Sequence, residues 1–277
     1  MRWVCLILLL MSVGFFDNRS LFAAGKKAAG VHPIIDAKYG WLYGGTIDGK
    51  WVGDDAFKAK IKGGEQYRLY SATKFLGIER GSTPEDVPEE SLHVEVDLKK
   101  ELLKENTVIG ICGDWNALPR VPKFQQTGQP AYQQAVHEFL AGKGLPKAKV
   151  HITQIWRIDL MGTGVEDVLI SATTDRKGYG DEATGQIGDY SMVLLRRIVK
   201  GKVVTIPLKL ALYPNQKAVD SAEIEPLKFT IDAVLDVDGD GREEIIVRDD
   251  DHFGIGKTII QVHGMTLKEV LSASFTV

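Results

Sequence analysis

Two matching segments in the second half of the chain constrain its fold more than any other feature. Asp159–Ile170 aligns without gaps with Asp236–Val247, and every residue of the first copy lies 77 positions before its counterpart. Each copy holds two glycines, which make a tight loop, and an acidic residue eight positions after its first Asp. An alternating strand pattern precedes each copy and a β-branched segment follows it. Repetition of a strand, an acidic loop and a second strand is typical of repeat architectures.

The second copy carries the oxygen ligands of a calcium loop. Its three aspartates alternate along the chain, so the turning backbone can direct three carboxylates at one point. Gly239 and Gly241 allow the sharp, positive-φ conformations that such a turn needs. Calcium takes six to eight oxygen ligands, so a backbone carbonyl and a further carboxylate would add to the aspartates. The predicted metal ligands are Asp236, Asp238, Asp240, the backbone carbonyl of Arg242, and Glu244.

The alternative is an acidic hairpin that stays solvated and binds no metal. We favour calcium because carboxylates packed together without a cation would repel one another and stay protonated or splayed. A helical EF-hand is contradicted, since its twelfth position would be Val247 instead of a glutamate and the flanking segments are strands. The first copy has Met161 and Thr163 in place of the second and third aspartates, so we expect it to keep the turn without a calcium site.

The segment Asp236–Val247, with Phe253 and Gly254 shortly after it, resembles the FG-GAP/VCBS-type repeats of integrin-like β-propellers and of many exported bacterial proteins. The resemblance covers about residues 150–277 and two repeats, while the N-terminal half resembles no family that we can name. It implies that the acidic loop binds calcium on a propeller-type blade. The family usually has Asp at the fourth of its ligand positions, which are Asp236, Asp238, Asp240 and Glu244 in this chain.

The number of repeats and the patterns before them define the expected fold class. Closed propellers typically need four or more blades, and this chain has two copies of the repeat. We therefore predict a mainly β fold with one or two helices, in which two propeller-blade-like antiparallel sheets are joined to an N-terminal β-rich (α+β) region. In that region, the Asp48-Gly49 pair predicts a hairpin between Trp41–Tyr43 and Lys50–Val52.

One helix is predicted between the two halves of the chain. It begins near Pro130, and apolar residues recur at helical spacing as far as Leu140. Gly142 and Gly144 end the helix, so we place a domain boundary near residue 145. The expected organisation is a signal peptide over residues 1–24, an N-terminal β-rich domain over residues 25–145 and an FG-GAP/VCBS-like repeat region over residues 146–277.

The start of the chain predicts export. Arg2 precedes an apolar run over residues 3–16, which fits the core of a signal peptide and is shorter than the ~20 residues that span a bilayer. Small residues at positions 23–25 suit cleavage, although the polar Asp17–Arg19 interrupts the segment, and a retained N-terminal anchor is the alternative. No later stretch is long and apolar enough to span a membrane. We expect a periplasmic or extracellular protein with no transmembrane span after cleavage.

Charge and cysteine content exclude several classes of function. The formal charge is −3 and no Lys/Arg-rich segment stands out, so a nucleic-acid partner is not expected. Signal cleavage would leave Cys112 as the only cysteine, which excludes an intramolecular disulfide. We find no assembled catalytic motif, such as a Gly-x-Ser-x-Gly elbow.

These patterns favour a non-enzymatic function. We expect an exported, calcium-stabilised β-repeat protein that acts as a structural or binding module at the cell envelope or outside, with an unknown protein or carbohydrate ligand. The alternative is an exported hydrolase of unknown class with its site in the long loop around Asp114–Arg120. Catalysis there would require Asp114, Asn116 and Arg120 to converge in one concave pocket.

Overall fold

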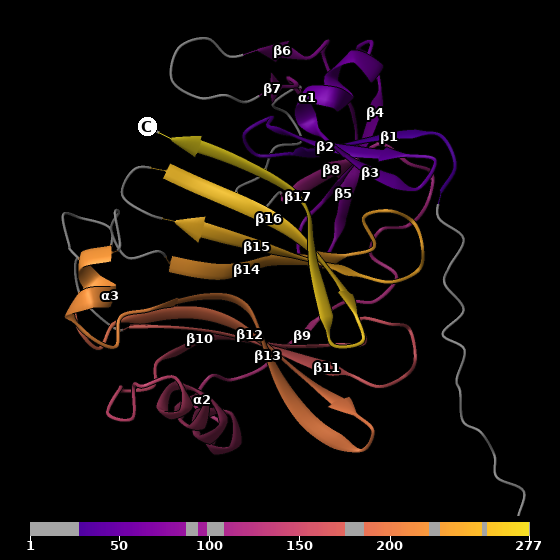
Figure 1. The fold of residues 1–277 in the computed structure, drawn as a ribbon. Helices are drawn as coiled ribbons and strands as arrows, with labels where there is room; N and C mark the ends of the chain where they lie inside the picture. The colour runs from indigo at the N-terminus through magenta and orange to yellow at the C-terminus, as the bar shows by residue number, and fades with distance from the viewer. Residues whose placement is uncertain are drawn as a thin grey trace, which may run out of the picture.

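The computed structural model describes residues 28–86, 94–98, 108–174, 186–221, 228–250 and 254–276. The described chain is mainly β, as the sequence predicted, and its sheets are antiparallel throughout. Three sheets stack as layers, and the C-terminal sheet is the middle layer (Figure 1). The predicted signal peptide over residues 1–24 lies outside the described residues.

The N-terminal layer is a six-stranded sheet. Its elements are β1 (Val31–Asp36), β2 (Leu42–Ile47), β3 (Lys50–Gly53), α1 (Asp54–Phe57), the 3-10 helix η1 (Lys58–Lys60), β4 (Gln66–Tyr70), β5 (Phe75–Arg80), β6 (Glu85–Asp86), β7 (Val94–Glu95) and β8 (Ile109–Ile111). The strand order is β3-β2-β1-β8-β4-β5, and β6 pairs with β7 in a separate ladder. The predicted hairpin is β2–β3, with φ angles of 48° at Asp48 and 72° at Gly49, as its tight turn requires.

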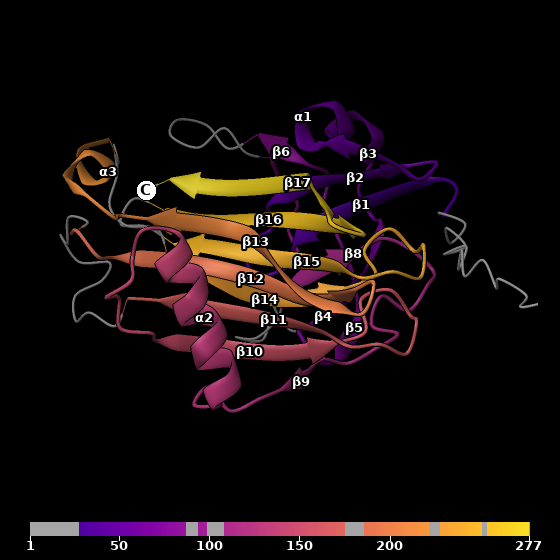
Figure 2. The same ribbon diagram turned by 60° about the horizontal axis from the view of Figure 1, so that its bottom comes forward.

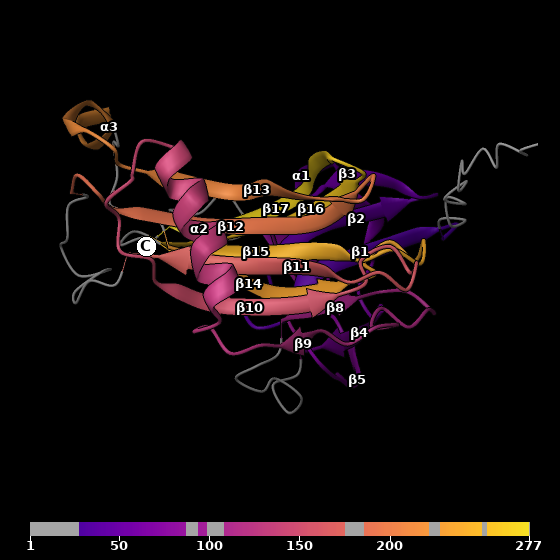
Figure 3. The ribbon, with the colours of Figure 1, turned by 90° about the horizontal axis from the view of Figure 1, so that it is seen from below.

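The second sheet has five strands and is covered by the longest described helix. Its elements are β9 (Lys123–Phe124), α2 (Pro130–Gly142), β10 (Ile152–Ile158), β11 (Asp167–Thr173), β12 (Tyr190–Val199) and β13 (Lys202–Leu212), and α3 (Gln216–Ser221) follows. The strand order is β13-β12-β11-β10-β9. Helix α2 begins at Pro130 as predicted and lies across the outer face of the sheet (Figures 2 and 3). Val136 and Leu140 attach it there by packing against Ile155 and Ile170.

The C-terminal sheet is buried on both faces. Its strands are β14 (Lys228–Leu235), β15 (Glu244–Asp250), β16 (Gly254–His263) and β17 (Thr266–Thr276), in sequential order. Along β15 the side chains alternate between faces, as in any strand. Ile245 and Val247 pack against the five-stranded sheet, whereas Ile246 packs against the N-terminal sheet. The uninterrupted apolar run of β15 follows from this burial on both sides.

Candidate metal centre

The two matching segments fold into equivalent hairpins. The first joins β10 to β11 and the second joins β14 to β15, and both confirm the predicted strand, loop and strand. The first loop closes on the pair Ile158–Asp167 and the second on Leu235–Glu244, so the registers keep the offset of 77 residues. Gly239 and Gly241 adopt the predicted positive φ angles, 73° and 83°, and the equivalent glycines of the first loop do the same, with 68° at Gly162 and 81° at Gly164.

Three predicted ligands in the second loop form a buried acidic group. One carboxylate oxygen from each of Asp236, Asp238 and Glu244 lies within 4.8 Å of the other two. The exposed fractions of these residues are only 4%, 0% and 2%. Oxygen atoms at such separations can contact a single cation. The group could therefore hold a metal ion.

Hydrogen bonds hold these carboxylates in place but leave one oxygen unsatisfied. The N–H of Val237 donates to Oε2 of Glu244 at 2.8 Å, and the N–H of Gly241 donates to Oδ2 of Asp236 at 3.0 Å. The amide Nε2 of Gln261, from β16, bridges Oδ2 of Asp238 at 3.2 Å and Oε1 of Glu244 at 3.0 Å. The second oxygen of Asp236, Oδ1, is buried without a hydrogen-bond partner among the described residues. A buried orphan acceptor of this kind is costly unless a cation or proton satisfies it.

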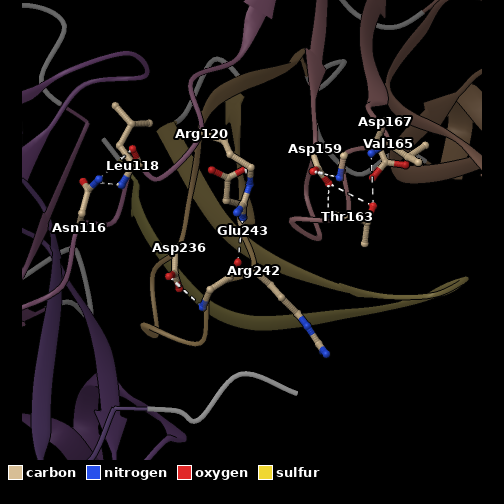
Figure 4. Close-up of polar contacts among 12 residues, drawn as sticks. Asn116, Leu118, Arg120, Asp159, Thr163, Val165, Asp167, Asp236, Arg242 and Glu243 are labelled. Atoms are coloured by element: carbon tan, nitrogen blue, oxygen red, sulfur yellow. Dashed lines mark hydrogen bonds and ion pairs between the residues drawn. The ribbon is translucent and has the colours of Figure 1, made fainter. Parts of the chain in front are cut away.

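The other two predicted ligands lie beside this group. Asp240 is buried, and its Oδ1 accepts the N–H of Arg242 at 2.9 Å, so its carboxylate is not among the three that converge. The Arg242 side chain points away from the Asp236 carboxylate in Figure 4, toward Nδ1 of His263 at 3.5 Å. The structure therefore brings together the carboxylates of three predicted ligands. Asp240 and Arg242, whose predicted ligand is its backbone carbonyl, lie in the same loop.

Burial makes the negative charge of this group unfavourable. Burial, the largest cause, raises the pKa of Asp236 to about 7, helped by the charges of Asp238 and Asp240 and opposed by the hydrogen bond from Gly241. Burial and the charge of Asp238 likewise hold the pKa of Glu244 well above its usual value. Close carboxylates in a dry site need either protons or a cation. The surroundings of the group therefore disfavour its charged form in the absence of a cation.

Glu243 is a buried acid that the sequence analysis missed. It is 3% exposed, and neither carboxylate oxygen has a hydrogen-bond partner among the described residues. Burial raises the pKa of Glu243 to about 8. The positive charge of Arg120 opposes this rise, since Nε of Arg120 lies 3.5 Å from Oε2 of Glu243. The N–H of Glu243 donates to the carbonyl of Leu160 at 2.9 Å. The first loop therefore touches the second, which no local sequence pattern reveals.

The segment Asp114–Arg120 supports the acidic loop. The indole N–H of Trp115 donates to the carbonyl of Asp236 at 2.8 Å, and the N–H of Asp236 donates to the carbonyl of Ala117 at 2.8 Å. The Trp115 ring also lies so close to Gly239 that a Cβ there would come within 2.8 Å of it. Only glycine fits at this position.

The residues of the hydrolase alternative separate into different contacts. Asp114 is exposed, and Asn116 exchanges hydrogen bonds with the backbone of Leu118 at 3.1 and 3.2 Å. Arg120 instead donates from Nη2 to the carbonyl of Gly241 at 2.9 Å, beside Glu243. Figure 4 shows Asn116 and Leu118 apart from Arg120. The geometry gives no support to a catalytic site built from these side chains.

In the first loop, backbone N–H groups and an arginine side chain donate hydrogen bonds to the carboxylates of Asp159 and Asp167. Asp159 accepts the N–H groups of Thr163 at 3.0 Å and Gly164 at 2.5 Å (Figure 4). Burial acts to raise the pKa of Asp159, but these bonds and the charge of Arg120 lower it overall. Asp167, the counterpart of Glu244, receives two hydrogen bonds from Arg197 at 2.8 and 3.1 Å. Among the described residues, the first loop forms no group of acids able to share an ion.

Comparison of the chain with family models, with curated proteins and with solved structures found no match. In the described part of the chain, no helix combines the length and the apolar character that crossing a membrane demands.

Proposed function

We propose that the loop from Asp236 to Glu244 binds one calcium ion, and that the protein is an exported, calcium-stabilised structural or binding module of the FG-GAP/VCBS type. The observation that carries the proposal is the buried orphan oxygen of Asp236 beside the carboxylates of Asp238 and Glu244. Every donor in the loop is a hard oxygen, which favours calcium over the softer metals that prefer nitrogen or sulfur. Export rests on the apolar segment over residues 3–16.

Completion of the coordination shell requires only a local rearrangement. Calcium takes six to eight oxygens, and the three convergent carboxylates supply between three and six. In the proposal, Asp240 turns its carboxylate from the N–H of Arg242 toward the ion, and the carbonyl of Arg242 joins the shell. Water supplies the remaining ligands. Gln261 and the neighbouring N–H groups then position the carboxylates from outside.

The first test is direct measurement of bound metal. Titration calorimetry of metal-depleted protein should give one calcium per chain, and magnesium should bind more weakly because it demands a smaller octahedral site. Asp236→Asn should abolish calcium binding, whereas the matched change Asp159→Asn in the first loop should leave it unchanged. A stoichiometry of zero for wild-type protein, or equal binding by the Asp236→Asn variant, would refute the site.

A second test uses pH. Without metal, Asp236 and Glu243 have pKa values of about 7 and about 8, above the values of about 4 expected in the unfolded chain. The folded state therefore binds more protons between pH 4 and 8, so stability is greatest at low pH and is lost as pH rises through this window. Chelated protein should unfold more easily at pH 8 than at pH 5 in urea.

Calcium provides the control for this pH dependence. A bound ion keeps the surrounding carboxylates ionised, so the loss of stability toward pH 8 should shrink when calcium is saturating. Chelated protein that gains stability between pH 5 and pH 8 would contradict the electrostatic description of the site.

A further inference from the structure

A cleft with a volume of about 370 Å³ lies where the three sheets meet. The N-terminal sheet contributes Lys38 and the turn between β4 and β5, and the five-stranded sheet contributes Phe124 and Trp156. The C-terminal sheet contributes charged side chains of β14, β15 and β16. The volume falls within the range of small-molecule sites, toward its lower end. None of these residues belongs to the acidic loop.

One wall of the cleft is aromatic. Phe124 and Trp156 are cross-strand partners on β9 and β10, and their ring centroids lie 4.8 Å apart. Trp156 is almost buried, but Phe124 is 55% exposed. Exposure of a large ring beside a concave surface leaves a flat apolar face available to a ligand.

The charged part of the lining is firmly held. Lys257 is 3% exposed, and its Nζ lies 2.7 Å from Oδ2 of Asp36 and 2.8 Å from Oδ2 of Asp232. Asp232 sits at an irregularity in the β14–β15 register, where a bulge re-aims its side chain. The amide of Gln154 fixes this bulge by bonding both the N–H and the carbonyl of Ile231, at 2.7 and 2.9 Å. The charged groups are therefore preorganised.

The balance of charge in this part of the lining selects a neutral ligand. Lys38 and Arg248 bring positive charge to the cleft, while Asp232 remains 19% exposed and brings negative charge. Arg248 is itself paired with Asp250. A ligand anion would face Asp232, and a ligand cation would face Arg248 and Lys38. A neutral ligand with neighbouring hydroxyl groups can donate to the carboxylate and accept from the guanidinium at the same time.

We infer that this cleft binds a neutral saccharide of one or two rings, with a sugar face on Phe124 and hydroxyl groups between Asp232 and Arg248. The C–H groups on one face of a sugar ring are apolar and suit a flat aromatic surface, whereas its hydroxyls both donate and accept. The inference adds a ligand site to the module proposed above and takes its fold as the scaffold.

Titration calorimetry of calcium-saturated full-length protein tests the inference. The probes are glucose, galactose, mannose, N-acetylglucosamine, maltose, cellobiose, lactose and chitobiose, with glucuronate and galacturonate as anionic comparisons. At least one neutral sugar should bind with a Kd at or below about 1 mM. Phe124→Ala should weaken that binding by roughly tenfold, in line with the loss of one aromatic contact.

A matched variant controls for the loss of an exposed ring. Phe75 is 44% exposed and does not line the cleft, so Phe75→Ala should leave sugar affinity unchanged. Thermal unfolding of each variant establishes that it is folded, and Asp232→Asn provides a second, nearly isosteric change that should also weaken binding.

Three outcomes would overturn the saccharide site: no neutral sugar that binds with a Kd at or below about 1 mM, affinity unchanged in folded Phe124→Ala, or stronger binding of the anionic sugars. Sugar binding by protein that does not bind calcium would overturn the metal proposal alone. Calcium binding without sugar binding would overturn only the cleft.

Discussion

Calcium at one hundred times its dissociation constant should stabilise the protein by about 2.7 kcal/mol, because the proposed site exists in the folded loop and not in the unfolded chain. For a chain of this size, the thermal midpoint should rise by roughly 5–10 °C. The loop is the reason: Asp236, Asp238 and Glu244 converge only when β14, β15 and their hairpin are formed. Thermal unfolding with calcium and with a chelator measures the difference.

Paired variants assign this response to one loop. Asp238→Ala should remove most of the calcium-dependent rise, since it deletes a ligand that is fully buried in the acidic group. Thr163 lies in the exposed first loop, so Thr163→Ala should leave the calcium-dependent rise unchanged. If the thermal midpoint of wild-type protein does not change in millimolar calcium, after verified removal of bound metal, then the second loop is an acidic turn that binds no calcium.

The largest loss of stability should come from the buried ion pair that joins Asp167 of the first hairpin to Arg197 of β12. Arg197→Met should cost about 3–5 kcal/mol, because it leaves Asp167 as a buried charge without its partner. Asp167 is 4% exposed and Arg197 is 8% exposed, and Arg197 also donates to the carbonyl of Gly264 at 2.7 Å. Burial raises the pKa of Asp167 against the opposing charge of Arg197, so the carboxyl group is already poorly solvated. Urea unfolding in saturating calcium provides the measurement.

Two controls separate burial from charge. The double change Asp167→Leu with Arg197→Met should recover much of the loss, since replacement of a buried pair by apolar residues is often neutral. Arg157→Met removes an exposed arginine that pairs with Glu166 at 2.7 Å, and it should cost less than about 1 kcal/mol. Equal losses for Arg157→Met and Arg197→Met would show that the burial argument is wrong.

The sequence predicted the features that local patterns determine. The 77-residue offset predicted two equivalent hairpins, and the structure reproduces even the residue pairs that close them. The Asp48-Gly49 turn and the start of α2 at Pro130 depend on backbone preferences of a few residues, so they too were predictable. The mainly β fold class follows from the sum of such signals.

Features that depend on contacts between layers were not predictable from one sequence. Gln261 bonds to the acidic group because β16 packs beside the loop. Glu243 is buried beside the group, where its N–H bonds to the first loop. The segment Asp114–Arg120 suggested catalysis because it is polar and irregular, yet Trp115 and Arg120 bind the backbone of the second loop. Nothing in the sequence near Trp115 indicates a partner more than one hundred residues away. Such partners are set by tertiary packing.

The position of the C-terminal sheet has a consequence for the order in which the protein can assemble. The strands β14–β17 follow the other two sheets in the chain, yet they lie between them and supply one side of both apolar interfaces. A nascent chain that ends after β13 therefore lacks the strands that cover these two apolar sheet faces. Burial of these two interfaces must follow the synthesis of β14–β17, and until then the exposed apolar faces make the chain vulnerable to aggregation.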